Sequence, residues 1–300
     1  MTYKPNLGFI GLGIMGTPMS GHLADAGYKL TLYDINTEAA YKAAESRGNI
    51  KVAELPAKVA ELSDIVITML PSGKPVQETA LGKGGLIEGF RPGSLLLDTS
   101  SSEPDLTIET AGVLKEHGID MVDAPVSGAR WGARAAELVF MAGGDSKSVS
   151  RVMPLLNIMG TRVFHLGPVG SGHIMKSINN LITAMTFMAT AEGLVIGKNK
   201  GLDPDIMTDV INESTGMSWI SKTQIKQRIT SRKFDDPFKL ELMIKDIGIA
   251  MGIAERAGLD ISLCLTGRKL WEKSGEFAGN NSSISEMVKW VEHMTGTTVE

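Results

Sequence analysis

One segment of this 300-residue chain combines a lysine with amide side chains at helical spacing. Four polar residues stand at positions i, i+3, i+4 and i+7, which is one face of a helix: Lys176, Asn179, Asn180 and Thr183. Most other residues up to Val195 are apolar or small, as expected for a helix that is buried on nearly all sides. An ammonium group on such a helix is costly unless it is paired or functional.

The chemistry that this face could support is proton transfer at an alcohol. Removal of a hydride from an alcohol carbon requires a group that takes the hydroxyl proton, and a partly desolvated lysine can serve as that base. The neighbouring amides could hold a substrate carboxylate or hydroxyl without adding charge. The alternative is that Lys176 reaches solvent or pairs with a carboxylate. His173 shares the face, but a lone histidine at a helix start is more often structural.

A second segment, at the start of the chain, carries the spacing Gly-x-Gly-x-x-Gly between an apolar run and a helical pattern. Gly11 permits a tight turn, Gly13 lets the backbone approach a pyrophosphate, and Gly16 lets the helix pack closely on the strand. The alternative is a glycine turn without a ligand. The position at the first strand–helix junction favours a dinucleotide site. Its expected residues are Gly11, Leu12, Gly13, Ile14, Met15 and Gly16.

Asp34 follows 18 residues after Gly16, at the end of the next apolar run. A carboxylate at this place hydrogen-bonds the ribose hydroxyls of NAD and repels the 2′-phosphate of NADP. The next three residues include no arginine or lysine, although Lys42 and Arg47 lie further along and could weaken the preference. We therefore predict NAD as the cofactor, with NADP disfavoured.

The elements that position these residues form two groups. In the first half, short apolar runs alternate with helical stretches such as Met15–Ala26 and Thr37–Arg47, which predicts a parallel sheet covered by helices on both faces. The expected strands are Leu7–Ile10, Leu30–Tyr33, Ile65–Met69, Ser94–Leu97, Met121–Val122 and Leu138–Met141.

From Ser171 onward only helical patterns occur. We predict a Rossmann-type α/β domain, doubly wound and mostly parallel, over residues 1–168, followed by an all-α domain over 169–300. Pro168, Gly170 and Gly172 supply the break between the two domains. The expected helices are Ser171–Lys200, Asp203–Glu213, Ser218–Ser231, Leu240–Ala257, Ile261–Ser274 and Ile284–Met294.

Composition excludes several other classes of protein. A net charge of −4 and a pI near 5.8 argue against a nucleic-acid-binding surface. The single cysteine, Cys264, rules out an intrachain disulfide and a cysteine-built metal site, and no metal is expected. We see no signal peptide at Met1–Asn6 and no apolar run of the roughly 18 residues that a membrane span needs, so we expect a cytoplasmic protein without a membrane partner.

The chain resembles the β-hydroxyacid dehydrogenase family, which includes 3-hydroxyisobutyrate dehydrogenases and tartronate semialdehyde reductases. The likeness covers essentially the whole length in order, and the joint pattern is specific. Four stretches carry it: residues 8–16 with the glycines, Asp123–Gly128 with the sequence DAPVSG, Gly172–Asn180, and the pair Lys245-Asp246.

The resemblance implies a 3-hydroxy acid or its semialdehyde as a small anionic substrate, and homodimers or homotetramers. It implies that Lys176 is the catalytic acid/base and that Asn180, with Asn179 behind it, fixes the substrate. Ser127 and Gly128 would receive the substrate carboxylate. On the cofactor side, the resemblance implies roles for Met69, Leu70, Pro71, Thr99 and the helical-domain residue Lys245.

One departure concerns the segment after Ser127-Gly128. Where many relatives carry glycines, this chain has Ala129 and Ala136, with Arg130 between them. The segment is either a loop whose side chains point outward, or a place where Arg130 meets a second anionic group of the substrate, such as a distal carboxylate or sulfonate. The identity of the hydroxy acid therefore stays open.

Three alternatives are weighed against this assignment. A related reductase for glyoxylate or succinic semialdehyde fits the same pattern, whereas imine reductases of similar build usually lack the lysine. A 6-phosphogluconate dehydrogenase resembles the first half but needs a much longer helical domain. A non-catalytic dinucleotide-binding scaffold is the alternative from another class, because fold alone does not fix function. Lys176, Asn179 and Asn180 are all present and favour an enzyme.

Overall fold

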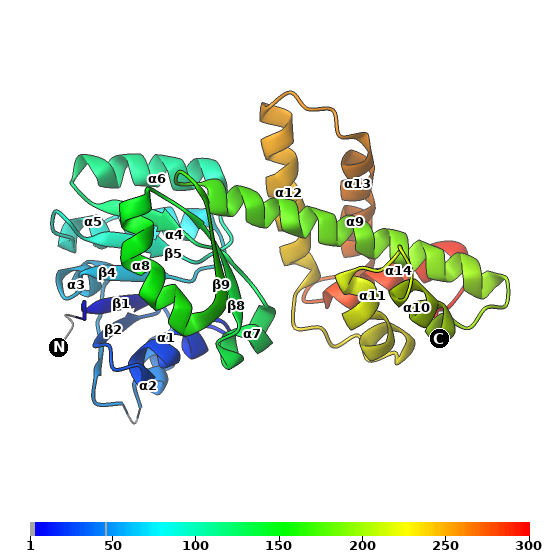
Figure 1. The fold of residues 1–300 in the computed structure, drawn as a ribbon, viewed down its shortest axis with the longest axis horizontal. Coiled ribbons are helices and arrows are strands. Elements are labelled where there is room, and N and C mark those ends of the chain that lie inside the picture. The colour runs from blue at the N-terminus through cyan, green and yellow to red at the C-terminus, as the bar shows by residue number, and fades with distance from the viewer. Residues whose placement is uncertain (1–3, 46) are drawn as a thin grey trace. The chain divides into compact units, whose positions relative to one another are not determined.

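A computed structural model describes residues 4–45 and 47–300, and these form two compact units, Met1–Lys176 and Ser177–Glu300 (Figure 1). The units divide inside helix α9 (Ser171–Asn199), eight residues after the predicted boundary at residue 168. The reason is that His173, in the first turns of α9, forms hydrogen bonds with residues of the first unit. Residues 1–3 of the expected N-terminus, and Ser46 of the predicted helix Thr37–Arg47, lie outside the described residues.

The first unit is built on one mostly parallel sheet with strand order β3-β2-β1-β4-β5-β6-β8-β7, and β9 pairs with β8. The predicted Rossmann-type fold is confirmed. Strands β1, β2, β4, β5 and β6 run parallel, so their carboxyl ends lie at one edge. The strands are β1 (Leu7–Ile10), β2 (Leu30–Tyr33), β3 (Ile50–Val52), β4 (Ile65–Thr68), β5 (Leu95–Asp98), β6 (Asp120–Asp123), β7 (Val126–Ser127), β8 (Leu138–Gly143) and β9 (Gly160–Gly167).

Three of these strands were not predicted from the sequence: β3, β7 and β9. The first two have three and two residues, too short for a hydrophobic period to show. Strand β9 has eight residues, but most of them are exposed or half-buried, so no apolar alternation marks it. The sheet also differs from a simple doubly wound parallel sheet, because its strand β8 pairs antiparallel with β6 and β7.

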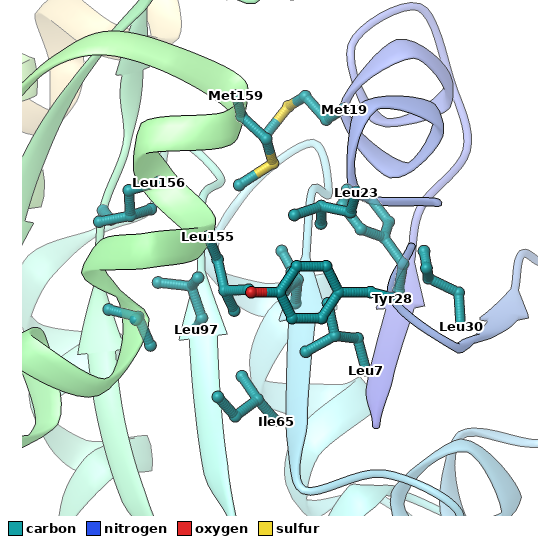
Figure 2. Packing of buried hydrophobic residues seen from close by; sticks show 14 of the residues in the cluster. Leu7, Met19, Leu23, Tyr28, Leu30, Ile65, Leu97, Leu155, Leu156 and Met159 are labelled. Atoms are coloured by element: carbon teal, nitrogen blue, oxygen red, sulfur yellow. The ribbon is translucent and has the colours of Figure 1, made fainter. Parts of the chain in front are cut away.

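Helices cover both faces of this sheet and bury its apolar side chains. Figure 2 shows Leu155, Leu156 and Met159 of α8 packed with Met19 and Leu23 of α1 over apolar residues of the strands. This burial is the main stabilising contribution to the unit. The helices are α1 (Gly16–Asp25), α2 (Thr37–Ala44), α3 (Pro56–Glu61), α4 (Gly73–Leu81), α5 (Leu86–Gly89), α6 (Pro104–Glu116), α7 (Ala129–Ala135) and α8 (Ser146–Met159).

The second unit is helical, as predicted, and its described residues add only an isolated bridge between Lys239 and Ser283. Trp271 is fully buried in its core, with its ring edge against Phe187 and its indole N–H donated to the Ala184 carbonyl. The elements after α9 are α10 (Pro204–Asn212), α11 (Trp219–Thr223), a π-helix (Ile225–Thr230), α12 (Leu240–Arg256), α13 (Ser262–Ala278), a 3₁₀ turn (Ile284–Glu286) and α14 (Met287–Thr295). The predicted single helix Ser218–Ser231 is therefore wrong, since a π-helix follows α11.

Helix α9 is not buried on nearly all sides, which corrects the sequence-based expectation. Ile178, Ile182 and Ile196 are 40%, 57% and 67% exposed, and with exposed Ala189 they line one helical face. We call these four residues the α9 stripe. By length and composition alone, α9 is long and apolar enough to cross a membrane. This differs from the expectation that no apolar run in the chain is long enough for a membrane span. However, 44% of the most apolar window of α9 is buried inside the protein. Core helices of soluble proteins meet the same criterion, so this is weak evidence for a membrane.

Candidate active site

The glycine-rich loop joins β1 to α1 and has the form that a dinucleotide requires. Gly11 has a φ of +96°, and a side chain there would overlap the carbonyl oxygen of Met69. Gly13 is exposed, and no atom of another described residue beyond its chain neighbours lies within 4 Å of the place where a Cβ would stand. No side chain caps the start of α1. The loop thus leaves open backbone at the helix N-terminus, where phosphate groups bind.

Asp34 directly follows β2 and links its own loop to the glycine-rich loop by hydrogen bonds. Its Oδ2 accepts a hydrogen bond of 2.6 Å from the Leu12 amide, and its Oδ1 accepts one of 2.8 Å from the Asn36 amide. The carboxylate is half-buried beside the glycine-rich loop. It therefore stands where the adenosine ribose of a bound dinucleotide requires an acceptor. Asp34 also holds the loop itself, a role that the sequence did not reveal.

The loops after β4 and β5 are connected to each other at the same sheet edge. The Leu70 amide donates to the Ser100 hydroxyl at 2.8 Å, and the Thr99 hydroxyl donates to the Thr68 carbonyl at 2.7 Å. Thr99 is fully buried, so its hydroxyl serves the backbone. The predicted cofactor residues Met69, Leu70, Pro71 and Thr99 follow directly after β4 and β5, and those strands place them at one edge.

The segment from Ser127 to Ala136 departs from ordinary backbone geometry. Gly128 has a φ of 126°, and the two alanines Ala129 and Ala136 have φ values of 49° and 57°. Such a left-handed conformation costs an L-residue with a side chain roughly 1–2 kcal/mol. The segment therefore adopts a glycine-type conformation at two positions that carry alanine.

Arg130 lies on the wall of a pocket of about 650 Å³ beside the glycine-rich loop. Its guanidinium stacks on the Trp131 ring at 4.4 Å, and its buried Nε has no hydrogen-bond partner among the described residues. The half-buried Arg130 side chain therefore lies along this pocket and does not extend freely into solvent. The pocket is lined by Leu12, Gly13, Ile14, Thr17, Pro18, Gly21, His22, Asp25, Ala39, Lys42, Ala43, Arg47, Arg130 and Arg134.

Lys176 is half-buried in the second turn of α9, three residues after His173. His173 is only 1% exposed, and its ring is hydrogen-bonded to Thr107 and to the Ser100 carbonyl. This geometry fits the structural interpretation of His173 and leaves no open ring nitrogen for a substrate.

In the second unit the two amides belong to a polar chain that ends on a buried carboxylate. Asn179 donates to Asn180 Oδ1 at 3.1 Å, and Asn180 donates to Asp246 Oδ2 at 2.6 Å. Asp246 is 3% exposed and forms an ion pair of 3.1 Å with Lys245. Asp246 therefore orients Asn180. The role of Asp246 could not be predicted from the sequence, because 66 residues separate it from Asn180.

The fold and these residues define a class of protein, a dehydrogenase that binds a dinucleotide on its amino-terminal unit. Two family models match the chain. The model described as the NAD-binding domain of 6-phosphogluconate dehydrogenase covers residues 6–167. The model described as NAD-binding of NADP-dependent 3-hydroxyisobutyrate dehydrogenase covers residues 170–291.

Individual proteins agree with these models. The chain is 33% identical to 2-(hydroxymethyl)glutarate dehydrogenase of Eubacterium barkeri, over 98% of this chain and 97% of that protein. It is also 33% identical to NAD-dependent L-serine dehydrogenase of Pseudomonas aeruginosa, over 90% and 93%. The solved structure of Mycobacterium tuberculosis 3-hydroxyisobutyrate dehydrogenase with L-serine matches with a TM-score of 0.87 and 30% identity, over 96% of this chain and 99% of that one.

The chain therefore belongs to the β-hydroxyacid dehydrogenase family, as the resemblance indicated. It is an NAD-dependent oxidoreductase that acts on the CH–OH group of small hydroxy acids. The open glycine-rich loop and the acceptor Asp34 fit this cofactor.

The preference for NAD over NADP can be tested at Asp34. We predict a higher kcat/KM with NAD(H) than with NADP(H). Asp34→Asn should lower this ratio by roughly tenfold or more, because hydrogen bonds to charged groups contribute about 1.5–3 kcal/mol and the repulsion of the 2′-phosphate also disappears. Asp34→Ala should lower binding of both cofactors, because it also removes the acceptor for the Leu12 amide.

Steady-state kinetics with both cofactors measure this ratio. Glu38→Gln, which removes the exposed carboxylate in the first turn of α2, is the matched control and should leave the ratio unchanged. Equal or reversed efficiencies in the wild-type protein would contradict the prediction.

Proposed function

We propose that this chain oxidises a small 3-hydroxy acid, or reduces the matching semialdehyde, with Lys176 as the acid/base. The observation that carries the proposal is the half-buried ammonium at the start of α9, on a unit that also carries the glycine-rich loop and Asp34. The names of the relatives support the substrate class. Both 2-(hydroxymethyl)glutarate and L-serine carry a hydroxyl on the carbon next to the one that bears a carboxylate.

Bound NAD supplies the hydride acceptor, and the residues of this chain supply the rest of the chemistry. Lys176 takes the hydroxyl proton as the carbon is oxidised and returns it in the opposite direction. Asn180, whose amide is oriented by Asp246, holds the substrate, with Asn179 behind it. Ser127 and Gly128 receive the carboxylate through hydroxyl and backbone donors.

Arg130 supports a finer assignment of the substrate, namely a dianion. The guanidinium has a buried Nε without a hydrogen-bond partner among the described residues, and it stands three residues after Ser127. One relative acts on a glutarate, which has two carboxylates. A charge-assisted hydrogen bond from Arg130 to the distal carboxylate would select such a substrate.

The α9 stripe supports a proposal about assembly. Four exposed apolar residues on one helical face are more than isolated surface residues, and contiguous apolar patches mark interaction sites. We propose that a second copy of this chain covers the stripe in a homodimer or homotetramer.

The central prediction concerns Lys176. Lys176→Ala should lower kcat by roughly 10²–10⁴, the usual contribution of a positioned acid–base group, and leave the Kd for NADH nearly unchanged. Lys176→Arg should rescue little, because a guanidinium does not release its proton near neutral pH. Asn180→Ala should act mainly through KM, because it removes a group that holds the substrate in ground and transition states alike.

Lys198→Ala removes an ammonium from the other end of the same helix and serves as the control, with kcat expected at the wild-type value. The measurements are steady-state kinetics and fluorescence titration with NADH. A folded Lys176→Ala variant that binds NADH and turns over at the wild-type rate would overturn the mechanism.

The second prediction tests the dianion. Arg130→Ala should raise KM for 2-(hydroxymethyl)glutarate by roughly ten- to hundredfold, from the loss of about 1.5–3 kcal/mol of charge-assisted hydrogen bonding, and change KM for 3-hydroxyisobutyrate little. Arg134→Ala, on the same pocket wall, is the control. An equal change for both substrates together with a raised Kd for NADH would assign Arg130 to the cofactor instead.

The third prediction concerns the α9 stripe. The wild-type protein should sediment as a dimer or tetramer, and Ile182→Glu should shift it toward the monomer, because a carboxylate cannot be buried there without a partner. Leu55→Glu replaces a leucine of similar exposure (55%) in the first unit and should keep the wild-type mass. A monomeric wild-type protein at micromolar concentration, or one that co-sediments with lipid vesicles through this stripe, would contradict the proposal.

A further inference from the structure

The first turn of α9 is capped by a carboxylate from a distant strand. Asp123, the last residue of β6, is fully buried. Its Oδ1 accepts a hydrogen bond of 2.7 Å from the Gly170 amide, and its Oδ2 accepts one of 2.9 Å from the His173 amide. Helix N-termini leave amides without partners in the helix, and a neighbouring side chain of the same segment usually supplies the acceptor. Here the acceptor comes from 47–50 residues earlier.

The His173 ring attaches the same turn to two further elements. Its Nε2 donates to the Ser100 carbonyl at 3.1 Å, and its Nδ1 forms a hydrogen bond of 2.9 Å with the Thr107 hydroxyl of α6. The ring nitrogens lie 3.6 Å from Asp98 and 3.7 Å from Asp123, both fully buried. Thr68 and Ser102 in turn donate to the Asp98 carboxylate.

The backbone at Gly172 lies too close to β8 for any side chain to fit at this position. A Cβ at Gly172 would overlap the Met141 carbonyl oxygen of β8 and would stand 2.8 Å from Asp123 Oδ2. The start of α9 therefore rests directly on the ends of β6 and β8. Burial raises the pKa of the Asp123 carboxyl above its ordinary value; the Asp98 charge adds to this effect, and the His173 ring and the two backbone donors oppose it only in part. A buried carboxylate of this kind is costly to keep, and its partners offset that cost.

We propose that Asp123 and His173 are positioning residues for Lys176. Lys176 follows His173 by three residues, about one helical turn, in the same compact unit as the dinucleotide loop. By fixing the first turn of α9 on the sheet edge, the two residues fix where the ammonium stands relative to the cofactor-binding edge. This inference rests on the proposed role of Lys176.

The test compares two variants that each lose a capping carboxylate. Asp123→Asn replaces one acceptor oxygen by an N–H group that cannot accept from the helix start. Its kcat should fall by roughly ten- to hundredfold, because a misplacement of about 1 Å can cost 10²-fold in rate, while the Kd for NADH stays within about twofold. Asp145→Asn removes the cap of α8, where Asp145 accepts from the Lys147 and Ser148 amides at 3.0 Å, and should lower Tm without changing kcat.

A readout independent of turnover separates positioning from stability. The rate of Lys176 labelling by acetic anhydride at a fixed pH, followed by mass spectrometry, should shift in Asp123→Asn, because the first turn of α9 loses a backbone contact that holds it on the sheet edge. It should not shift in Asp145→Asn. Because this measurement needs no substrate, it still reports on the position of Lys176 if the proposed function fails and Lys176→Ala proves fully active.

Two further variants keep the test decisive if Asp123→Asn does not fold. Thr107→Val removes the hydrogen-bond partner of the His173 ring with an isosteric side chain, and Gly172→Ala displaces the helix start without removing a charge. In each of these two variants, the fold-decrease in kcat should exceed the fold-change in the Kd for NADH. Folded variants with wild-type kcat and wild-type labelling would overturn the proposal. A loss of kcat with unchanged labelling would also overturn it, because Asp123 would then serve stability alone.

Discussion

The first unit depends on how the backbone amides at two helix starts find partners outside their own helices. Both α1 and α9 begin with N–H groups that their own helix cannot satisfy. At α1 no side chain caps the helix, and the glycine-rich loop keeps those amides available for an anionic cofactor. At α9 the protein satisfies them with its own buried carboxylate, Asp123. One constraint thus yields a binding site at the first helix and a fixed support for Lys176 at the second.

The sequence was sufficient where the signal is local. The glycine loop, Asp34 and the Lys176 face are each defined by residues that are close together in the chain, so spacing is enough to predict them. It was insufficient where partners are far apart in the chain, as with Asp123 and His173 or Asn180 and Asp246. It also failed where burial does not follow the apolar pattern, as in exposed β9 and in α9, whose apolar residues are partly on the surface.

The segment after Ser127 has a left-handed backbone at two positions that are not glycine. Ala129 and Ala136 adopt the left-handed conformations that glycine adopts without cost, and α7 between them carries Arg130. The packing of α7 against the neighbouring helix includes a hydrogen bond between the His22 ring and the Ala133 carbonyl. Tertiary contacts therefore maintain this turn against local preference, and they keep Arg130 on the pocket wall.

The cap that joins β6 to the start of α9 also bears on how such proteins can recombine. The two family models meet between residues 167 and 170, yet Asp123 lies on one side of this junction and the amides it binds lie on the other. A chimaera joined there would pair a carboxylate from one parent with a helix start from another. Exchange of the helical half between relatives is therefore permitted only when the aspartate, the close-packed glycine and the histidine are compatible across the junction. In this chain, the junction between the two matched regions is therefore a place where residues from both sides contact each other directly.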